Sequence, residues 1–436
     1  MNISFIKNPA GCKCGREHFV NIKNLITGKN AINNLPDELK KLNCKKVFLF
    51  ADINTYPIAG EKITKLLSSN NILCSEFVFK EQHLEPDEKA VGAAVMHYDT
   101  SCDGVVALGS GVINDIAKIL SATARVPYII VATAPSMDGY ASATSSMALG
   151  GVKVTLPSKC ADVIIGDTDI LKTAPTDMLK AGLGDMLAKY ISICEWRISN
   201  LINEEYYCED VADLVRTALS KCVENSDGLL NRNDEAIEAV FYGLVIGGIA
   251  MTYAGASRPA SGVEHYFSHI WDMRSLEFNT PSSLHGLQCA AATYIAAKLY
   301  DKIRHTKPDK EKALAFVKNF NFDLWANKLR AFLGDSAEPL IELEAKEQKY
   351  NAKKHAARLD KIIESYDKII EIIDEEIPSV DVLTKLYDSI NLPKTPDEFS
   401  IDSSLLPMTF KATKDIRDKY VLSRLAWDLG IIDEII

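Results

Sequence analysis

The chain has 436 residues, of which 47% are hydrophobic and 25% are charged, the composition of an ordinary soluble globular protein. This length favours two domains. A formal net charge of −10 excludes a surface built for nucleic acid, because phosphate backbones attract clustered lysine and arginine. A single small phosphate is not excluded, since it needs only local cations.

The N-terminus has no basic region followed by an apolar stretch, so we expect no secretory signal. The sequence contains no apolar run of about 18 residues, the length that spans a bilayer, and we expect no membrane span. Ten cysteines are scattered singly along the chain, a pattern typical of reduced thiols. Together these features predict a cytoplasmic protein.

Strand and helix patterns alternate in the first part of the chain. Strands are predicted over 45–52, 74–79, 103–110 and 127–134, and helices over 61–72, 86–100 and 111–125. Such alternation predicts a Rossmann-like α/β domain, with a parallel sheet covered by helices. Two further β segments, 150–157 and 161–167, are expected to form a hairpin or edge strands.

After about residue 170 the strand patterns end and helical patterns follow, beginning with 174–200, 212–230 and 233–255. The segment 339–377 carries dense charge of both signs and is expected to be a solvated helical face; a protein contact is the alternative. We therefore expect a dinucleotide-binding α/β domain over 1–170. An all-α domain that binds metal and substrate is expected over 171–436.

The first motif is a glycine turn. The strand over 103–110 is followed by Gly109-Ser110-Gly111 and then by a helix. Glycines let the backbone approach a ligand, and a helix start presents unpaired N–H groups to an anion. Asn114 and Asp115 lie in the first helical turn, where they either cap the helix or reach the ligand. The turn predicts a pyrophosphate site, although it lacks the G-x-G-x-x-G pattern, and an ordinary strand-to-helix turn is the alternative.

Asp52 ends the strand predicted over 45–52, a position that suits contact with ribose hydroxyls. In the usual fingerprint the acid follows the glycine turn by about 20 residues, whereas Asp52 precedes it. A simple turn acid is the alternative. An acid at this place favours NAD over NADP, because it would repel a 2′-phosphate.

A carboxylate and three histidines form the second motif. Asp185 follows Gly184, His265 and His269 are four residues apart on one helix face, and His285 precedes another helix. One carboxylate and two imidazoles suit a divalent ion such as Zn²⁺, Ni²⁺ or Fe²⁺, with positions left open for substrate. The spacing does not distinguish His265 from His269 as the ligand, and buried core histidines are the alternative.

Five stretches occur in order between residues 109 and 290: GSGVINDIAK, TAPSMDGYAS, GLGDMLAKY, SRPASGVEHYFSH and LHGLQCA. With CKCGREH near the N-terminus, they resemble the sn-glycerol-1-phosphate dehydrogenase family, particularly its bacterial branch. This family belongs to the superfamily of 3-dehydroquinate synthases, glycerol dehydrogenases and iron-containing alcohol dehydrogenases. The resemblance covers most of residues 10–290. It implies a dehydroquinate synthase-like fold, an α/β domain followed by an all-α domain.

The resemblance also implies roles for residues. The dinucleotide, NAD or NADP, would contact Gly109, Ser110, Gly111, Asn114, Asp115, Thr133, Ser136 and Ser142. The metal would be bound by Asp185, His265 and His285. Asp138 and His269 would contact the substrate, beside Asp185, and take part in proton transfer.

The function implied is the reversible reduction of dihydroxyacetone phosphate to sn-glycerol 1-phosphate by a metal-dependent, NAD(P)H-linked homo-oligomer. Arg258 is a candidate for the substrate phosphate because a guanidinium offers fork-like donors; a surface ion pair is the alternative. Two other functions stay open. One is a glycerol or polyol dehydrogenase that acts on an unphosphorylated substrate. The other is a catalytically inactive, nucleotide-binding regulatory protein.

Cys12, Cys14 and His18 are a last group of metal-ligating residue types. They suggest part of a second metal site, but two thiols one residue apart are a poor chelate alone. A structural role without metal is therefore the favoured interpretation.

Overall fold

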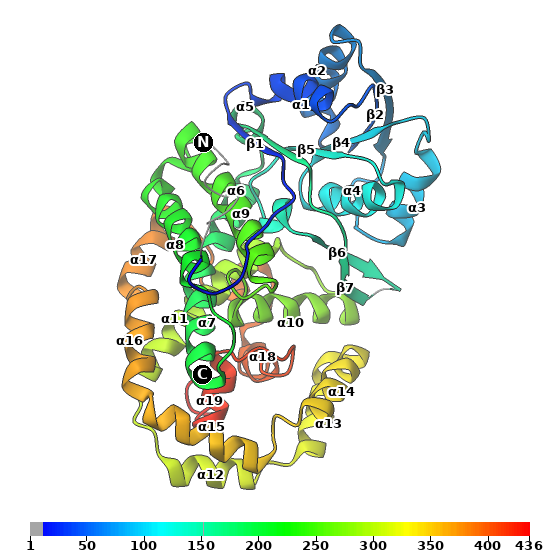
Figure 1. The fold of residues 1–436 in the computed structure, drawn as a ribbon. Coiled ribbons are helices and arrows are strands. Elements are labelled where there is room, and N and C mark those ends of the chain that lie inside the picture. The colour runs from blue at the N-terminus through cyan, green and yellow to red at the C-terminus, as the bar shows by residue number, and fades with distance from the viewer. Residues whose placement is uncertain (1–11, 151) are drawn as a thin grey trace. The chain divides into compact units, whose positions relative to one another are not determined.

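The computed structural model describes residues 12–150 and 152–436 (Figure 1). The chain divides into two compact units, Met1–Met186 with Asp213–Ala256 and Leu187–Ala212 with Ser257–Ile436. The last strand ends at Asp167, and only helices and irregular segments follow it in the described part of the chain. The domain boundary at residue 170 stays a prediction, since compactness divides the chain differently.

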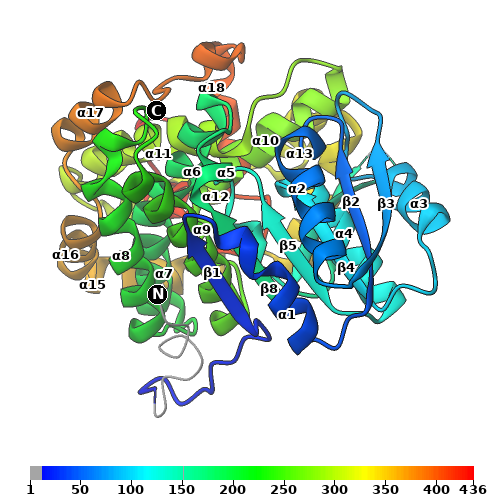
Figure 2. The ribbon, with the colours of Figure 1, turned by 90° about the horizontal axis from the view of Figure 1, so that it is seen from above.

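The first unit is built on a six-stranded parallel sheet with the strand order β1-β8-β5-β4-β2-β3 (Figure 2). Its strands are β1 Asn24–Gly28, β2 Lys46–Asp52, β3 Leu73–Phe79, β4 Gly104–Gly109, β5 Tyr128–Ala132 and β8 Val163–Asp167. The inner strands β4, β5 and β8 are buried along their whole length, as near-continuous apolar runs require. The predicted parallel sheet is thereby confirmed.

Two strand predictions need correction. The segment around β8 was expected in a hairpin or at an edge, but β8 is an inner strand paired in parallel with both β1 and β5. The hairpin is formed instead by β6 Thr144–Leu149 and β7 Val152–Pro157. The run VIIGD has no polar alternation, which is typical of a strand covered on both faces. The edge strand β1 was not predicted.

Helices cover both faces of this sheet. On one face, α1 Leu35–Lys41 and α2 Tyr56–Ser69 pack through Leu35 and Ile63 onto Leu49 and its neighbours. Side chains alternate along a strand, so the adjacent Phe48 faces the other side, where its ring meets Tyr98 at 5.4 Å between centroids. That side carries α3 Glu88–His97 and α4 Gly111–Ala124, of which α4 packs on β4 and β5.

The remaining elements of the first unit are helical. They are η2 Ala31–Asn34, η3 Asp138–Ala141, α5 Thr168–Leu171, α6 Thr176–Leu187, most of α8 Glu209–Glu224, η4 Ser226–Gly228 and α9 Asp234–Ala254. Among the described residues, α9 is the one helix long and apolar enough to cross a membrane. However, 72% of its most apolar window is buried inside the protein, as in a core helix. The Asn233 side chain caps its start, accepting from the Glu235 N–H, and Gly255 ends it with a φ of 66°.

The second unit is helical throughout its described length. Three helices, α7 Lys189–Asn203, α10 Val263–Phe278 and α11 His285–Arg304, pack on one another. The other helices are α12 Lys310–Lys318, α13 Phe322–Leu333, η5 Gly334–Ala337, α14 Glu338–Glu347, α15 Ala352–Glu364, α16 Tyr366–Glu376, α17 Val380–Ser389, η6 Pro396–Phe399, η7 Ser403–Leu405, α18 Leu406–Thr413 and α19 Leu422–Asp428. The charged segment 339–377 forms α14 to α16. Its isoleucines and leucines turn inward, and most of its charges face solvent, as predicted.

Candidate active site

The sheet of the first unit has a point where its direction of growth reverses. The chain runs from β2 outward to β3 and then crosses back to β4 on the opposite side of β2. In open parallel sheets, ligands bind outside the carboxyl ends of the strands at such a point. Asp52 ends β2 and Gly109 ends β4. The acid and the glycine turn therefore lie at neighbouring strand ends, although their order in the sequence differs from the usual fingerprint.

Asp52 has a local role in the turn after β2. Its Oδ1 accepts from the backbone N–H groups of Asn54 and Thr55, both at 2.8 Å, and from the Thr55 hydroxyl at 3.1 Å. The turn-acid interpretation is therefore correct. These bonds occupy Oδ1, so they do not exclude a ribose contact through Oδ2.

The glycine turn leads directly into α4. A Cβ atom on Gly109 would lie 2.5 Å from the Cβ of Ile113, so a larger residue would force α4 away from β4. Within the described residues, no side chain caps the start of α4. Its first N–H groups, which have no acceptor inside the helix, are thus suited to an anion. The Ser110 hydroxyl instead bonds that of Ser136 at 2.8 Å and accepts from the Tyr140 hydroxyl at 3.2 Å.

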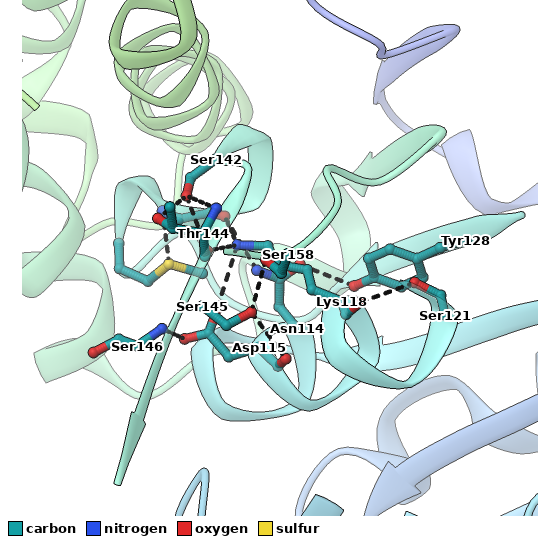
Figure 3. Close-up of polar contacts among 12 residues, drawn as sticks. Asn114, Asp115, Lys118, Ser121, Tyr128, Ser142, Thr144, Ser145, Ser146 and Ser158 are labelled. Carbon is teal, nitrogen blue, oxygen red and sulfur yellow. Dashed lines mark hydrogen bonds and ion pairs between the residues drawn. The ribbon is translucent and has the colours of Figure 1, made fainter. Parts of the chain in front are cut away.

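Figure 3 shows that α4 holds the segment 139–146 through a buried polar network. The fully buried Lys118 ammonium donates to the carbonyl oxygens of Gly139 at 2.6 Å and Thr144 at 2.9 Å. The Asn114 amide donates to the same Gly139 carbonyl at 3.2 Å and accepts from the Tyr128 hydroxyl at 2.9 Å. Asn114 thus positions the segment, a role that the sequence did not suggest.

Asp115 extends this network to the hairpin. Its Oδ2 accepts from the backbone N–H of Ser146 at 3.2 Å, and its Oδ1 lies 3.3 Å from the Lys118 ammonium. The Ser142 hydroxyl donates to the Thr144 carbonyl at 3.0 Å, which fixes the entry to β6. Sequence reasoning missed Lys118. The available signal was a lysine one helical turn after Asn114 and Asp115, and therefore on the same face of α4 as these two polar residues.

Two glycines allow helices to approach the loop between β5 and η3. A Cβ on Gly182 of α6 would lie 1.8 Å from the carbonyl oxygen of Pro135. A Cβ on Gly248 of α9 would lie 2.7 Å from the carbonyl oxygen of Asp138. At the start of this loop, the Thr133 N–H donates to the Gly109 carbonyl at 3.1 Å. The loop is therefore held by close backbone contacts that no other residue type permits.

Asp185 lies one helical turn after Gly182 and is fully buried. Its Oδ2 accepts from the backbone N–H of Asp138 at 3.0 Å. The Asp138 side chain, at the start of η3, is half-buried. Of the residues predicted for substrate and metal, the first unit thus brings Asp138 and Asp185 together.

In the second unit, His265 is nearly buried and sits in the first turn of α10. Its Nδ1 lies 2.8 Å from Oε1 of Glu264, which also accepts from the Gly262 N–H at 2.7 Å. Glu195 fixes the same helix start by accepting from the Val263 N–H at 2.9 Å. Burial raises the pKa values of both Glu195 and Glu264. Because Oε1 of Glu264 also accepts from the Gly262 N–H, it acts as an acceptor whether or not the group is protonated, so Nδ1 of His265 carries the proton and Nε2 presents a lone pair.

His285, the first residue of α11, is oriented by a chain of hydrogen bonds. The Gln288 amide nitrogen donates to the Asp272 carboxylate at 3.1 Å, and this bond turns the Gln288 amide oxygen toward Ser268. The Ser268 hydroxyl donates to that amide oxygen at 2.5 Å. With its proton so used, the Ser268 oxygen accepts from Nδ1 of His285 at 2.8 Å. Nε2 of His285 is again left as a lone-pair donor, 3.6 Å from the Cys289 sulfur. This supporting chain was not predicted from the sequence.

The two imidazoles lie together, with ring centroids 5.0 Å apart. Ligand atoms of His265, His285 and Cys289 lie within 4.8 Å of one another, a spacing compatible with one metal ion. His269 is half-buried, and its ring centroid is 6.3 Å from that of His285. Two Nε2 donors with fixed tautomers fit a borderline divalent metal. The sequence did not single out Cys289.

Arg258 is a buried ion pair within the second unit. Its Nε and Nη2 donate to the two carboxylate oxygens of Glu205 at 2.7 and 2.5 Å. Its Nη1 donates to the Tyr420 carbonyl at 2.9 Å, and Nη2 also reaches the Ser199 hydroxyl at 3.2 Å. The side chain is 2% exposed. Because the side chain is buried and each of its three nitrogens serves a protein acceptor, the surface ion pair offered as the alternative is wrong, and the phosphate contact stays a prediction.

The chain was compared with known proteins. The family model for iron-containing alcohol dehydrogenases matches residues 26–175. A glycerol-1-phosphate dehydrogenase (NAD(P)+) of Halalkalibacterium halodurans is 36% identical over 293 residues, 66% of this chain and 73% of that protein. The enzyme of the same name from Pyrococcus horikoshii is 33% identical over 290 residues, 65% of this chain and 81% of that protein.

Solved structures agree with the fold. A glycerol dehydrogenase from Schizosaccharomyces pombe has a TM-score of 0.60 at 17% identity, over 95% of this chain and 90% of that one. A 1,3-propanediol oxidoreductase has a TM-score of 0.61 at 14% identity, over 95% of this chain and 98% of that one. At these identities the structures show the fold alone, whereas the sequence relatives confirm the resemblance. The chain therefore belongs to the family of NAD(P)+-linked glycerol-1-phosphate dehydrogenases, which are oxidoreductases.

Proposed function

We propose that this chain catalyses the metal-dependent, NAD(P)H-linked reduction of dihydroxyacetone phosphate to sn-glycerol 1-phosphate, and the reverse oxidation. The observation that carries the proposal is its 36% identity to a glycerol-1-phosphate dehydrogenase, over 73% of that enzyme's length. The polar architecture of each unit supports it.

The nucleotide is proposed to bind at the carboxyl ends of β2 and β4. Its pyrophosphate would lie on the first N–H groups of α4, next to Gly109, Ser110 and Gly111. Oδ2 of Asp52 would accept from a ribose hydroxyl, while Oδ1 keeps its bonds within the turn. A carboxylate at this place disfavours a 2′-phosphate, so we propose NAD over NADP as the preferred cofactor.

The metal is proposed to bind Asp185 together with Nε2 of His265 and of His285. A bound Zn²⁺, Ni²⁺ or Fe²⁺ would supply Lewis-acid stabilisation of the negative charge that develops on the substrate oxygen. The hydrogen bonds on the two Nδ1 atoms support this ligand choice, because such partners fix the ring orientation and raise ligand basicity. They also favour His265 over His269 as the ligand.

Asp138 and His269 are proposed to act on the substrate. His269 follows His265 by one helical turn and is half-buried, so its ring suits the transfer of a proton to the C2 oxygen. Asp138 would accept a hydrogen bond from a substrate hydroxyl. Its place is held by the bond from its own N–H to Asp185 and by the close approach of Gly248.

A glycerol dehydrogenase acting on unphosphorylated substrate is the second candidate. One observation favours it: Arg258, which the sequence suggested as the cation for the substrate phosphate, forms an ion pair with Glu205 instead. The two functions are separated by kcat/KM for dihydroxyacetone phosphate against dihydroxyacetone. A ratio that favours the free ketone would overturn the proposed substrate.

The test is NADH oxidation with dihydroxyacetone phosphate, with and without added Zn²⁺ or Ni²⁺. We expect Asp185→Ala and His265→Ala to lose bound metal and activity together, and His269→Ala to lose turnover while keeping metal. His305→Ala, which changes an exposed histidine after α11, is the matched control and should behave as the unaltered chain. Full activity of Asp185→Ala after chelation would contradict the metal role.

We also propose that the protein acts in the cytoplasm as a homo-oligomer. None of its ten cysteines, all within the described residues, forms a disulfide, and a reducing compartment preserves thiols. The assembly is proposed from the family alone. Light scattering coupled to size-exclusion chromatography measures it, and a monomeric mass would refute this part.

A further inference from the structure

The segment that leads into the first unit brings two thiols and one imidazole together. The Cys12 and Cys14 sulfurs are 3.1 Å apart, and Nε2 of His18 is 3.3 Å from the Cys14 sulfur. We propose that these three side chains bind a second, structural metal ion of the zinc class. The ligands share no residue with the proposed catalytic set, so the site is independent of the proposed reaction.

The backbone of Cys12 to Arg16 is arranged as a sulfur-binding turn. The Gly15 N–H donates to the Cys12 carbonyl at 3.3 Å, and the Arg16 N–H donates to the Cys14 sulfur at 3.4 Å. Gly15 has a φ of +77°, and a Cβ there would meet no atom within 4 Å. Glycine is therefore required for its conformation rather than for space. An N–H directed at sulfur favours the thiolate, which is the form that binds metal.

His18 is held in the tautomer that a metal ligand needs. It is 1% exposed, and its Nδ1 lies 3.1 Å from the carbonyl oxygen of Tyr253 in α9. A carbonyl oxygen only accepts, so Nδ1 carries the proton and Nε2 presents a lone pair toward the Cys14 sulfur. A backbone carbonyl on the remote nitrogen is the usual support of a metal-bound histidine.

The distances fit a tetrahedral ion that enters with small shifts. Zinc lies about 2.3 Å from sulfur and about 2.0 Å from nitrogen, so neighbouring ligand atoms of a tetrahedron are about 3.5–3.8 Å apart. The sulfur–nitrogen separation of 3.3 Å needs to open by about 0.2 Å and the sulfur–sulfur separation of 3.1 Å by about 0.7 Å. The two cysteines are thiols and form no disulfide. Thiolate donors select zinc-class ions over Mg²⁺ or Ca²⁺.

The third ligand answers the objection that two thiols one residue apart are a poor chelate. Because structural zinc sites have four protein ligands, one more is required. Residues 1–11 contain no cysteine, histidine, aspartate or glutamate, so that ligand comes from a later residue. Serine replacement of each of the seven buried cysteines in turn is a direct search for it, and the half-buried Cys74 serves as the control.

Metal analysis of the purified full-length chain by mass spectrometry is the first test. We expect Cys14→Ser and His18→Gln each to lose one metal equivalent and keep the other, and Asp185→Ala to show the converse. Cys74→Ser is the matched control, because Cys74 is a half-buried thiol outside the cluster. If Cys14→Ser and the unaltered chain contain the same metal, the proposal is wrong.

Cobalt substitution tests the site without depending on how the altered turn folds. Cys289→Ser is used as the background, because Cys289 lies beside His285 and would add its own signal. After the metal is replaced by Co²⁺, we expect a thiolate-to-cobalt charge-transfer band in the near ultraviolet. The band should persist in Asp185→Ala, whose dehydrogenase activity is lost for a separate reason. If the band is absent from the Cys289→Ser chain, the cluster binds no metal.

Discussion

Replacing Gly182 by alanine tests how closely α6 approaches the loop that carries Asp138. The new Cβ would lie 1.8 Å from the Pro135 carbonyl oxygen, and an ordinary contact of about 3.4 Å requires a shift of about 1.6 Å. Overpacking costs about 1–3 kcal/mol, and a backbone oxygen yields less easily than a side chain. Against this cost, alanine stabilises a helix interior by about 1 kcal/mol relative to glycine. We expect a net loss of about 2 kcal/mol, since this contact belongs at the severe end of that range.

For a unit of this size, such a loss lowers Tm by about 4–8 °C in differential scanning calorimetry. A shift of this kind also moves Asp185, which lies one turn further along α6. It thereby disturbs the hydrogen bond that the Asp138 N–H donates to the Asp185 carboxylate. We expect kcat/KM to fall by about two orders of magnitude, the effect of a misplacement of about 1 Å. Gly92→Ala in α3 is the matched control, because a Cβ there meets no atom within 4 Å and should raise stability slightly. Equal Tm and activity of Gly182→Ala and the unaltered chain would refute the close approach.

Three further predictions concern the two units. Ser268→Ala removes the acceptor of His285 Nδ1 and should weaken metal binding by about 10–100-fold in competition with a chelator, with the fold retained; unchanged affinity would contradict the orienting role. Lys118→Met removes charged hydrogen bonds worth about 1.5–3 kcal/mol each from the segment 139–146, and should raise the KM for NADH about tenfold in steady-state assays. Burial raises the pKa values of Cys44 and Cys160 to about 11 and 12, so iodoacetamide should not label them in the native chain at pH 8, when both are thiols. Their labelling should begin only as the pH approaches these values, and rapid reaction at pH 8 would show that the native fold leaves them accessible.

The parallel sheet could be predicted because its strands carry apolar runs that alternate with helical periods. The errors in the prediction of its strands have a physical cause. The run VIIGD follows a β segment directly, which suggested a hairpin, yet its lack of polar alternation is typical of an inner strand. The strand β1 is short, and its sequence NLITG has two adjacent apolar residues and no polar–apolar alternation that would distinguish it from a loop.

The sequence proposes residue types for the site, which stay a prediction, but it does not report their hydrogen bonds. Spacing places His265 and His269 on one helix face and cannot choose between them. The choice depends on which Nδ1 finds a carboxylate, and Glu264 provides it for His265. Arg258 shows the converse: its partners Glu205 and Tyr420 are 53 and 162 residues away in sequence, so no local pattern reports its burial.

In the turn after β2, the two carboxylate oxygens of Asp52 are used differently. Oδ1 of Asp52 closes the turn, and an asparagine oxygen can accept the same N–H bonds from Asn54 and Thr55. Asp52→Asn would thus abolish the charge while preserving the architecture around it. Under the proposed ribose contact, coenzyme preference is therefore open to redesign by a change that spares the scaffold, and selection has an equally short route from one nicotinamide pool to the other.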